Sequence, residues 1–138
     1  MSAQSKPVVR SYRDLVVFQR SMDLAVLIYR IARSLPADER YALSLQLRRA
    51  AVSIPANIAE GHGREHLGEY IHHLSIASGS LAEIETEVEL AGPQRLALVA
   101  PDLVDQAREL AREVRILLAA LIKALRKRQE SFKPGRAA

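Results

Sequence analysis

Cysteine and tryptophan are absent from this chain of 138 residues, and only 4% of its residues are aromatic. Without cysteine, neither disulfides nor thiol chemistry is available, which suits a reducing compartment, and we expect the cytoplasm. The longest apolar run, Ile116 to Ile122, is too short to cross a bilayer, and residues 1–7 lack the apolar segment of a signal peptide. We therefore expect no membrane partner. The scarcity of aromatic rings also disfavours recognition of bases by stacking.

Apolar residues recur at helical spacing in the first long stretch, which begins at Tyr12 and ends at Leu35-Pro36. This stretch carries two apolar stripes. The first stripe, which we expect to be buried, is Leu15, Phe18, Met22, Ala25, Tyr29 and Ala32, and the second is Val17, Leu24, Ile28 and Ile31. A helix that is apolar on two faces needs two partners. One partner is its own bundle, and we expect the other to be a second subunit.

The second stretch reads as a helix with a proline in its interior. We expect Asp38 to cap its start and Gly61-His62-Gly63 to stop it. Pro55 removes the hydrogen bond that its N–H would have made to the carbonyl of Ala51, at a cost of roughly 3 kcal/mol in a helix interior. The sequence therefore predicts a kink in this helix.

Two further helices complete the chain. The third begins near Arg64 or Glu65 and ends at Gly92-Pro93, and the fourth opens with Pro101 in its first turn. The predicted fold is all-α, an up-down-up-down antiparallel four-helix bundle with a proline-kinked second helix. We expect one domain over residues 12–130, preceded by a flexible arm (1–11) and followed by a flexible basic tail (131–138).

Small residues predict how the second and third helices pair. If the two helices are antiparallel about a turn near Gly63, then Ala50 and Ala51 lie opposite Ser75 and Ala77. Small side chains that face one another allow a close approach of the two helices.

This topology separates charge along the bundle. Bases outnumber acids where the first helix starts, the second meets the third and the fourth ends, and acids outnumber bases at the other end. We expect the basic end to bind phosphates of RNA or DNA, with salt-sensitive affinity and no sequence specificity. The candidate residues are Arg13, Arg64, Lys123, Arg126, Lys127 and Arg128. The alternative is that both ends are simply solvated.

Four acids gather at the carboxyl end of the third helix, where negative charge is unfavourable. They are Glu83, Glu85, Glu87 and Glu89, which also form two like-charge pairs four residues apart. Cations would relieve this repulsion. Arg40, Arg108 and bases of a neighbouring subunit are the candidates, and solvation of an exposed face is the alternative.

Metal and catalytic sites are weakly supported. His62, His66, Glu69 and His73 share one helical face, but the glycines beside His62 place it outside a helix. Glu69 and His72 form half of a di-iron motif that requires two such halves. No phosphate-binding glycine loop, nucleophile elbow or zinc-protease motif is present. We therefore expect no metal, no cofactor, no catalytic residue and no enzymatic activity.

Three segments carry a resemblance to a known family. The longest is residues 46–61, Gln-Leu-Arg-Arg-Ala-Ala-Val-Ser-Ile-Pro-Ala-Asn-Ile-Ala-Glu-Gly, and residues 12–19 and 76–83 support it. Over Tyr12 to Leu125 the chain resembles the bacterial four-helix-bundle proteins encoded in intervening sequences of large-subunit ribosomal RNA genes. The same family includes the accessory protein of diversity-generating retroelements.

The resemblance implies a barrel-like homopentamer of four-helix bundles with a basic surface. In the retroelement relatives, that surface is associated with nucleic acid and with a reverse transcriptase. We expect a non-enzymatic oligomer that binds RNA or DNA at the basic end, and the alternative is a protein-interaction scaffold, for example for a reverse transcriptase. Five residues of the long motif are expected to be structural or intersubunit anchors: Arg49, Ser53, Pro55, Asn57 and Glu60.

Overall fold

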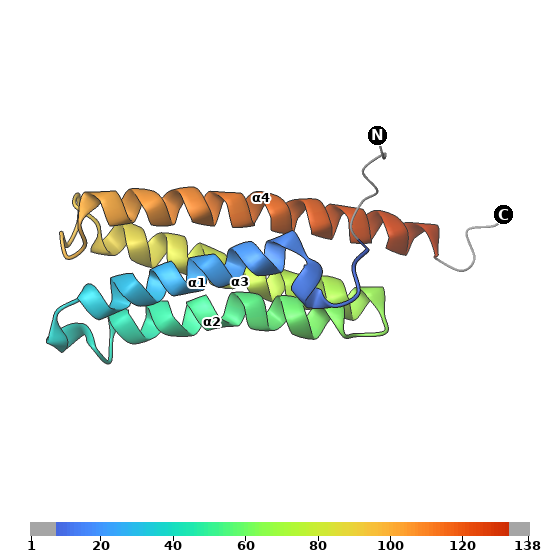
Figure 1. Cartoon of the computed structure of the whole chain (residues 1–138), viewed down its shortest axis with the longest axis horizontal. Helices are drawn as coiled ribbons and strands as arrows, with labels where there is room; N and C mark the ends of the chain where they lie inside the picture. Colours follow the sequence, from blue (N-terminus) through green and yellow to red (C-terminus); the bar gives the residue numbers. More distant parts are fainter. Residues whose placement is uncertain (1–7, 133–138) are drawn as a thin grey trace, which may run out of the picture.

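The computed structural model describes residues 8–132 as four long helices that lie side by side, with consecutive helices running in opposite directions (Figure 1). The helices are α1 (Val16–Ser34), α2 (Leu43–His62), α3 (Leu67–Ala91) and α4 (Pro101–Ser131), with short 3-10 helices η1 (Tyr12–Asp14) and η2 (Ala37–Glu39). Each long helix contacts the next, and α4 also contacts α1. The predicted all-α four-helix bundle is confirmed, and residues 8–132 contain no strand.

The predicted arm and tail fall largely outside the described part of the chain, which excludes residues 1–7 and 133–138. Within residues 8–132, no helix is long and apolar enough to cross a membrane. The kink expected at Pro55 stays a prediction, since α2 is one uninterrupted helix from Leu43 to His62.

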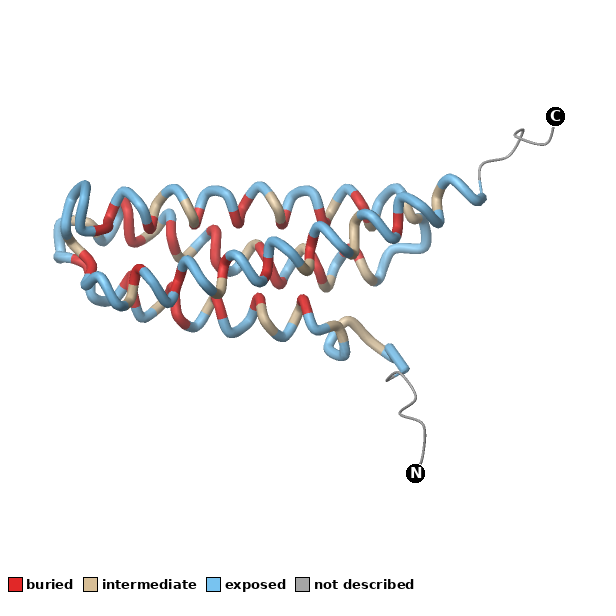
Figure 2. The backbone as a smooth tube through the Cα atoms, turned by 90° about the horizontal axis from the view of Figure 1, so that it is seen from above, coloured by how far each residue is buried: buried red, intermediate tan, exposed pale blue. Residues whose placement is uncertain are grey.

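The core is formed by the inward sides of all four helices, where the buried residues gather (Figure 2). In α1 the bundle buries the second of the two apolar stripes, Val17, Leu24, Ile28 and Ile31. The first stripe, expected to be buried, is only partly so: Phe18, Ala25 and Tyr29 are half-buried, and Met22 is exposed. The bundle therefore covers this side of α1 only in part: Ala32 is buried and Phe18, Ala25 and Tyr29 pack against the core, while Met22 remains exposed.

The chain enters its first two helices differently from the prediction. Ser11 and Asp14 form a capping box around η1, and α1 begins only after an extended residue, Leu15. Asp38 does not cap α2; it lies in η2, and α2 begins at Leu43 without a side-chain cap. A tight 3-10 turn after Pro36 takes up the residues that had been assigned to the start of α2.

The helix α2 ends at His62, within the predicted Gly61-His62-Gly63 stop, but the two glycines have separate roles. Gly61 is a buried residue inside α2, and Gly63 is the C-cap. A Cβ atom at position 61 would lie 2.8 Å from the Cβ atom of His73 in α3. Glycine is therefore needed at this position because α2 and α3 approach closely. After the turn, α3 begins at Leu67 rather than at Arg64 or Glu65.

A ladder of side-chain hydrogen bonds joins α2 to α3. Ser80 donates to the hydroxyl of Ser53 at 2.7 Å, and the Asn57 amide donates to the Ser53 carbonyl at 2.9 Å. A ring nitrogen of His73 lies 3.0 Å from the Asn57 side-chain oxygen. Because Ser53 is paired with Ser80 and Asn57 with His73, the predicted alignment of Ala50 and Ala51 with Ser75 and Ala77 is wrong.

Candidate nucleic-acid interface

The end of the bundle where α4 finishes brings together three segments that are distant in the sequence. The η1 turn, the α2–α3 connection and the last turns of α4 lie at this same end (Figure 1). Burial raises the pKa of Tyr70, near the start of α3, and the positive charge of Arg128 opposes this shift. Arg128 in α4 is thus close enough to act on the first turns of α3.

The last turns of α4 carry an uninterrupted run of positive charge. Between Glu113 and Glu130 the helix contains no acid, and its charged residues are Arg115, Lys123, Arg126, Lys127 and Arg128. The last four are exposed, and none of them makes an ion pair with another residue of the described chain. Cations at the carboxyl end of a helix also complement its dipole.

Three of these five cations, Arg115, Lys123 and Arg126, line a groove between α3 and α4. The groove has a volume of about 460 Å³ and is lined by Ser75, Ser78, Arg115, Ala119, Ile122, Lys123 and Arg126. The hydroxyls of Ser75 and Ser78 donate to the carbonyls of Ile71 and Leu74, so their remaining lone pairs can only accept. The positive side chains therefore provide the attraction for an anion in this groove.

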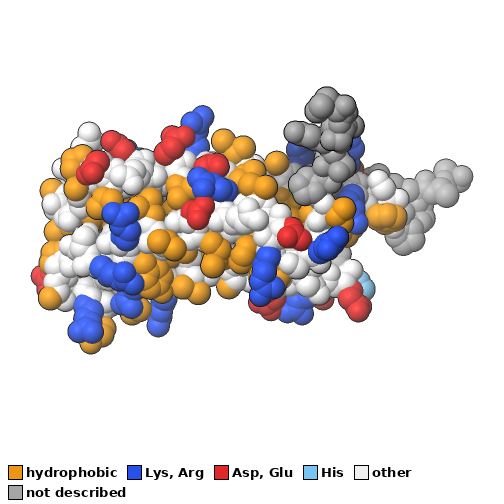
Figure 3. Space-filling model, viewed as in Figure 1, with side chains coloured by type: hydrophobic (Ala, Val, Ile, Leu, Met, Phe, Trp, Pro, Cys, Tyr) orange, Lys and Arg blue, Asp and Glu red, His pale blue; other side chains and the backbone are white. Residues whose placement is uncertain are grey.

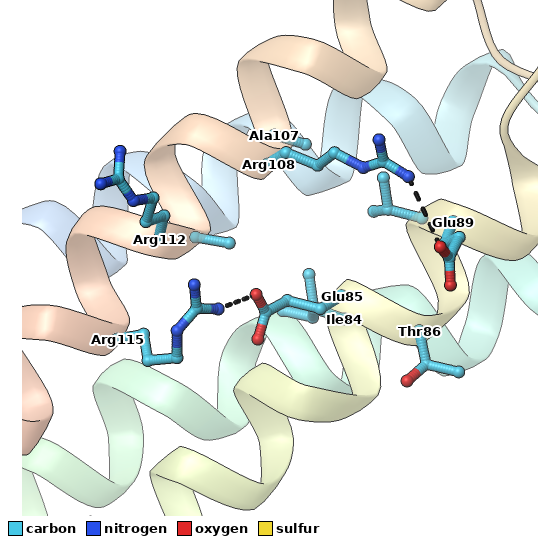
Figure 4. Close-up of a pocket in the computed structure, with 10 residues that line it drawn as sticks. Ile84, Glu85, Thr86, Glu89, Ala107, Arg108, Arg112 and Arg115 are labelled. Atoms are coloured by element: carbon cyan, nitrogen blue, oxygen red, sulfur yellow. Dashed lines mark hydrogen bonds and ion pairs between the residues drawn. The ribbon is translucent and has the colours of Figure 1, made fainter.

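A second groove lies on the same side of the bundle, nearer the start of α4 (Figure 4). It has a volume of about 480 Å³, but the charges on its rim are paired. Arg115 pairs with Glu85, and Arg108 lies 3.7 Å from Glu89. The two grooves have similar size, and Arg115 lines both. They differ because Lys123 and Arg126, which line only the groove nearer the end of α4, form no ion pair within residues 8–132.

These ion pairs give two acids of the α3 cluster, Glu85 and Glu89, cationic partners of the kind that was predicted for the cluster. Arg108 is a partner of the cluster, as expected, and Arg115 is a partner that the sequence reasoning missed. Arg40 pairs with no acid within residues 8–132; its guanidinium lies 5.7 Å from the ring centre of Tyr41.

The remaining two predicted phosphate ligands are already engaged. The guanidinium of Arg13 stacks 4.7 Å from the ring centre of Tyr12. Arg64 forms an ion pair of 2.6 Å with Glu60. Both arginines are at the predicted end, but neither lines the groove between α3 and α4. The candidate interface is therefore centred on α4, with Arg13 and Arg64 beside it.

Arg20, another base near this end, holds α1 against α4. Its Nε and Nη2 atoms each lie 2.9 Å from a carboxylate oxygen of Glu113. This hydrogen-bonded pairing lowers the pKa of Glu113 and raises the pKa of Arg20. A guanidinium that is held by two bonds is a structural clamp rather than a free phosphate ligand.

Four of the five residues singled out in the long α2 motif are buried or have a partner within the bundle. Ser53 and Asn57 belong to the ladder between α2 and α3, and Pro55 is buried. Glu60 pairs with Arg64, while Arg49 is exposed. None of the five lines the groove of the candidate interface.

The sequence reasoning missed three polar residues of the groove: Arg115, Ser75 and Ser78. For Arg115 a signal was available, since Arg115, Ala119, Ile122 and Arg126 follow one another at helical spacing on one face. The serines gave no comparable signal, because their position opposite α4 depends on how the two helices are aligned.

The histidines make ordinary contacts. His62 lies edge-to-face against Tyr70, with ring centres 5.7 Å apart, and His73 is held by Asn57. Within residues 8–132, no group of three or more histidine, aspartate or glutamate side chains is arranged to hold a metal ion.

Comparison with known proteins places this chain among related sequences. Residues 13–120 match the family model of the 23S rRNA-intervening sequence protein. A crystal structure from Bacteroides thetaiotaomicron VPI-5482, of a protein with unknown function from the S23 ribosomal protein family, is 28% identical and superimposes with a TM-score of 0.71. The match covers 78% of this chain and 96% of that chain. No curated protein matches this chain. The family model spans most of the bundle, and the chain belongs to the 23S rRNA-intervening sequence protein family.

Proposed function

We propose that this chain is a non-enzymatic, oligomeric protein that binds RNA or DNA through phosphate contacts at the end of α4. The observation that carries the proposal is the acid-free run of α4 with four cations that form no ion pair within residues 8–132: Lys123, Arg126, Lys127 and Arg128. Two of them line a groove that offers space for a phosphate chain. The family description refers to an intervening sequence of 23S rRNA and names no activity.

The chemistry of the groove favours phosphate over base recognition. Mobile lysine and arginine side chains bind phosphate oxygens irrespective of sequence and release counterions as they do so. Two aromatic rings lie at this end of the described chain near the candidate residues. Tyr12 is covered by Arg13 and by the edge of Phe18 at 4.9 Å, whereas Phe132, which follows the last turn of α4, is exposed. Stacking of bases on Tyr12 would require both contacts to be broken.

A pair of matched variants of α4 tests the site. Lys123→Glu with Arg126→Glu alters the groove, and Arg108→Glu with Arg112→Glu makes the same change of net charge on the same helix, outside that groove. Binding of fluorescent RNA and DNA is measured by anisotropy over a series of salt concentrations. We expect the first variant to lose at least about tenfold in affinity and about two units of salt slope. The control should remain close to the wild type.

Equal losses in the two variants would overturn the site, because only the net charge of the chain would then matter. Absence of any RNA or DNA binding by the wild type would overturn the nucleic-acid function itself. A protein-interaction scaffold, for example for a reverse transcriptase, is the second candidate, favoured by the exposed apolar side of α1. A protein partner retained after nuclease treatment would support it.

A further inference from the structure

One side of the bundle exposes apolar side chains that are not needed by its own core. On α1 and α2 these are Met22, Val26 and Val52, with exposed fractions of 45%, 64% and 50%. Half-buried Phe18 and Tyr29 flank them on α1. Hydrophobic side chains gather over the middle of the face seen in Figure 3. A contiguous apolar surface of this kind is typical of a protein–protein contact.

A groove rich in arginine continues this surface toward the end of α1 and the start of α2. Its volume is about 480 Å³, and its lining includes Tyr29, Leu35, Arg33, Arg40 and Arg48 but no acid. Arg48 is held in place, since it donates to the carbonyls of Ser44 and Arg40. None of the three arginines forms an ion pair within residues 8–132. The groove can therefore accept carboxylates beside an apolar surface.

The outer side of α3 has the complementary character. A shallow hollow of about 270 Å³ is lined by Gly79, Ala82, Glu83, Thr86 and Glu87. A Cβ atom at Gly79 would meet nothing within 4 Å, so the middle of the hollow is open. Ile76 and Leu90 are exposed on the same helix, one before the hollow and one after it.

The two acids of this hollow lack cationic partners. Glu83 and Glu87 form no ion pair with any residue in the described part of the chain, whereas Glu85 and Glu89 pair with α4. One carboxylate oxygen of Glu87 is buried and has no hydrogen-bond partner. Burial raises the pKa of Glu87 to about 7, and the nearby charge of Glu83 adds to the shift. A cation from outside the bundle would give the buried oxygen of Glu87 a partner and would offset the repulsion between Glu83 and Glu87.

The features of the two faces occur in the same order along the bundle. The hydrogen bond between Ser53 and Ser80 places Val52 and Gly79 within about 3 Å of the same level along the bundle. Because α2 and α3 run in opposite directions, Arg48 lies about one turn from Val52 in the same direction as Glu83 lies from Gly79. Apolar and small residues are therefore at the same level, and so are arginines and glutamates. Two copies lying side by side in the same orientation would match both sets.

We propose that the α1–α2 face of one copy, from Met22 and Val52 to Arg33 and Arg48, binds the outer face of α3 of a second copy at Gly79, Glu83 and Glu87. This inference rests on the oligomeric part of the proposed function. The two faces are on different sides of the bundle, so each copy presents one of them to each of two neighbours. Such a head-to-tail contact generates a ring where the rotation closes, or a filament where it does not.

Charge reversal on the two faces tests this contact. The first variant carries Arg33→Glu and Arg48→Glu, the second carries Glu83→Arg and Glu87→Arg, and the third carries all four substitutions. Association of nuclease-treated protein is measured by sedimentation equilibrium at low salt, and circular dichroism melts check folding. We expect each double variant to associate at least about tenfold more weakly, and the fourfold variant to recover association, because its faces have exchanged charges. Glu65→Arg with Glu69→Arg, the same charge change near the start of α3, is the control and should associate like the wild type.

Failures of this test and of the proposed function are distinguishable. A wild-type protein that stays monomeric would overturn both this inference and the oligomeric part of the proposed function, without bearing on the groove of α4. Association that persists in either double variant, or that the fourfold variant does not recover, would overturn this interface alone. Equal weakening in the control would also overturn it, since net charge would then explain the loss.

Discussion

On one side, α3 contacts α2 through small and hydrogen-bonded residues; on the other, it contacts α4 across two open grooves. Ser53, Asn57, His73 and Ser80 form the ladder on the α2 side, and Gly61 allows the close approach there. On the α4 side, exposed arginines and glutamates form the rim of the grooves. Buried polar groups demand particular partners, whereas exposed charges can exchange one partner for another. The α2 side therefore fixes the fold, and the α4 side remains available for ligands.

The strongest test of this contrast is a larger residue at the closest approach of α2 and α3. Gly61→Val places new atoms where a Cβ would lie 2.8 Å from the Cβ atom of His73 and 3.2 Å from the carbonyl oxygen of Tyr70. These atoms are near the backbone and cannot move aside easily. We expect a loss of about 3 kcal/mol in the free energy of unfolding, measured by urea denaturation.

Gly68→Ala is the matched control for this variant. Its Cβ would touch only the end of the flexible Gln129 side chain, at 3.4 Å. We expect its stability to stay within about 0.5 kcal/mol of the wild type. If the two variants were equally stable, α2 and α3 would not be in close contact at Gly61.

The next largest effect is expected when the ladder loses its central residue. Asn57→Ala removes the acceptor for His73 and a donor to Ser53. The groups left behind are half-buried, so we expect a loss of about 1–2 kcal/mol, measured in the same way. Combining it with His73→Ala should cost less than the sum of the two single losses. Strict additivity would show that the two side chains do not interact.

A smaller effect concerns the pH dependence that Glu87 adds to stability. Its pKa is about 7 in the folded chain against an ordinary value of 4.5, so the folded chain binds more protons between these pH values. Stability from this group is therefore greatest below pH 4.5 and is lost as the pH rises toward 7. Glu87 is partly exposed, and solvent screening limits the change to about 1 kcal/mol.

Glu87→Gln should flatten this part of the stability profile. The measurement is a series of urea denaturations from pH 4.5 to pH 7, at protein concentrations low enough to prevent association. The difference between the two profiles isolates the contribution of Glu87 to the pH dependence of stability. Parallel profiles for the two proteins would contradict the prediction.

The smallest effect is expected at an ion pair on the α4 side. Arg108 and Glu89 are 3.7 Å apart, and both side chains are more than half exposed. Arg108→Gln should change the free energy of unfolding by no more than about 0.5 kcal/mol. If Arg108→Gln lowered the free energy of unfolding as much as Asn57→Ala does, the α4 side of α3 would contribute to stability as much as the α2 side.

The sequence predicts the four helices well, because each has a long apolar pattern at helical spacing. The predicted start of α2 was wrong because Asp38 is equally suitable as a helix cap and as a residue of a 3-10 turn. Gly61 was read as a stop because a terminating glycine and a close-contact glycine look the same in a sequence. The alignment of α2 with α3 was wrong because small residues face one another acceptably at several offsets.

For the candidate interface, the sequence supplied the cations but not their surroundings. Lys123 and Arg126 were predicted from charge and topology, and both line the groove. Arg115 differs from these two cations because Glu85 of α3 neutralises its charge, and that pairing depends on contacts between α3 and α4. Such contacts follow from side-chain packing over the whole bundle and not from any local pattern.

The length of α4 gives the basic end a property of its own. Leu125 is the last buried residue of this helix, which continues to Ser131 and projects past the α2–α3 connection (Figure 1). Helical turns without tertiary packing are marginally stable in water, so the amide hydrogens beyond Leu125 should exchange rapidly with solvent. A polyanion laid across Lys127 and Arg128 would slow that exchange. Occupancy of the basic end can thus be followed from the backbone of the protein itself, without a label on the nucleic acid.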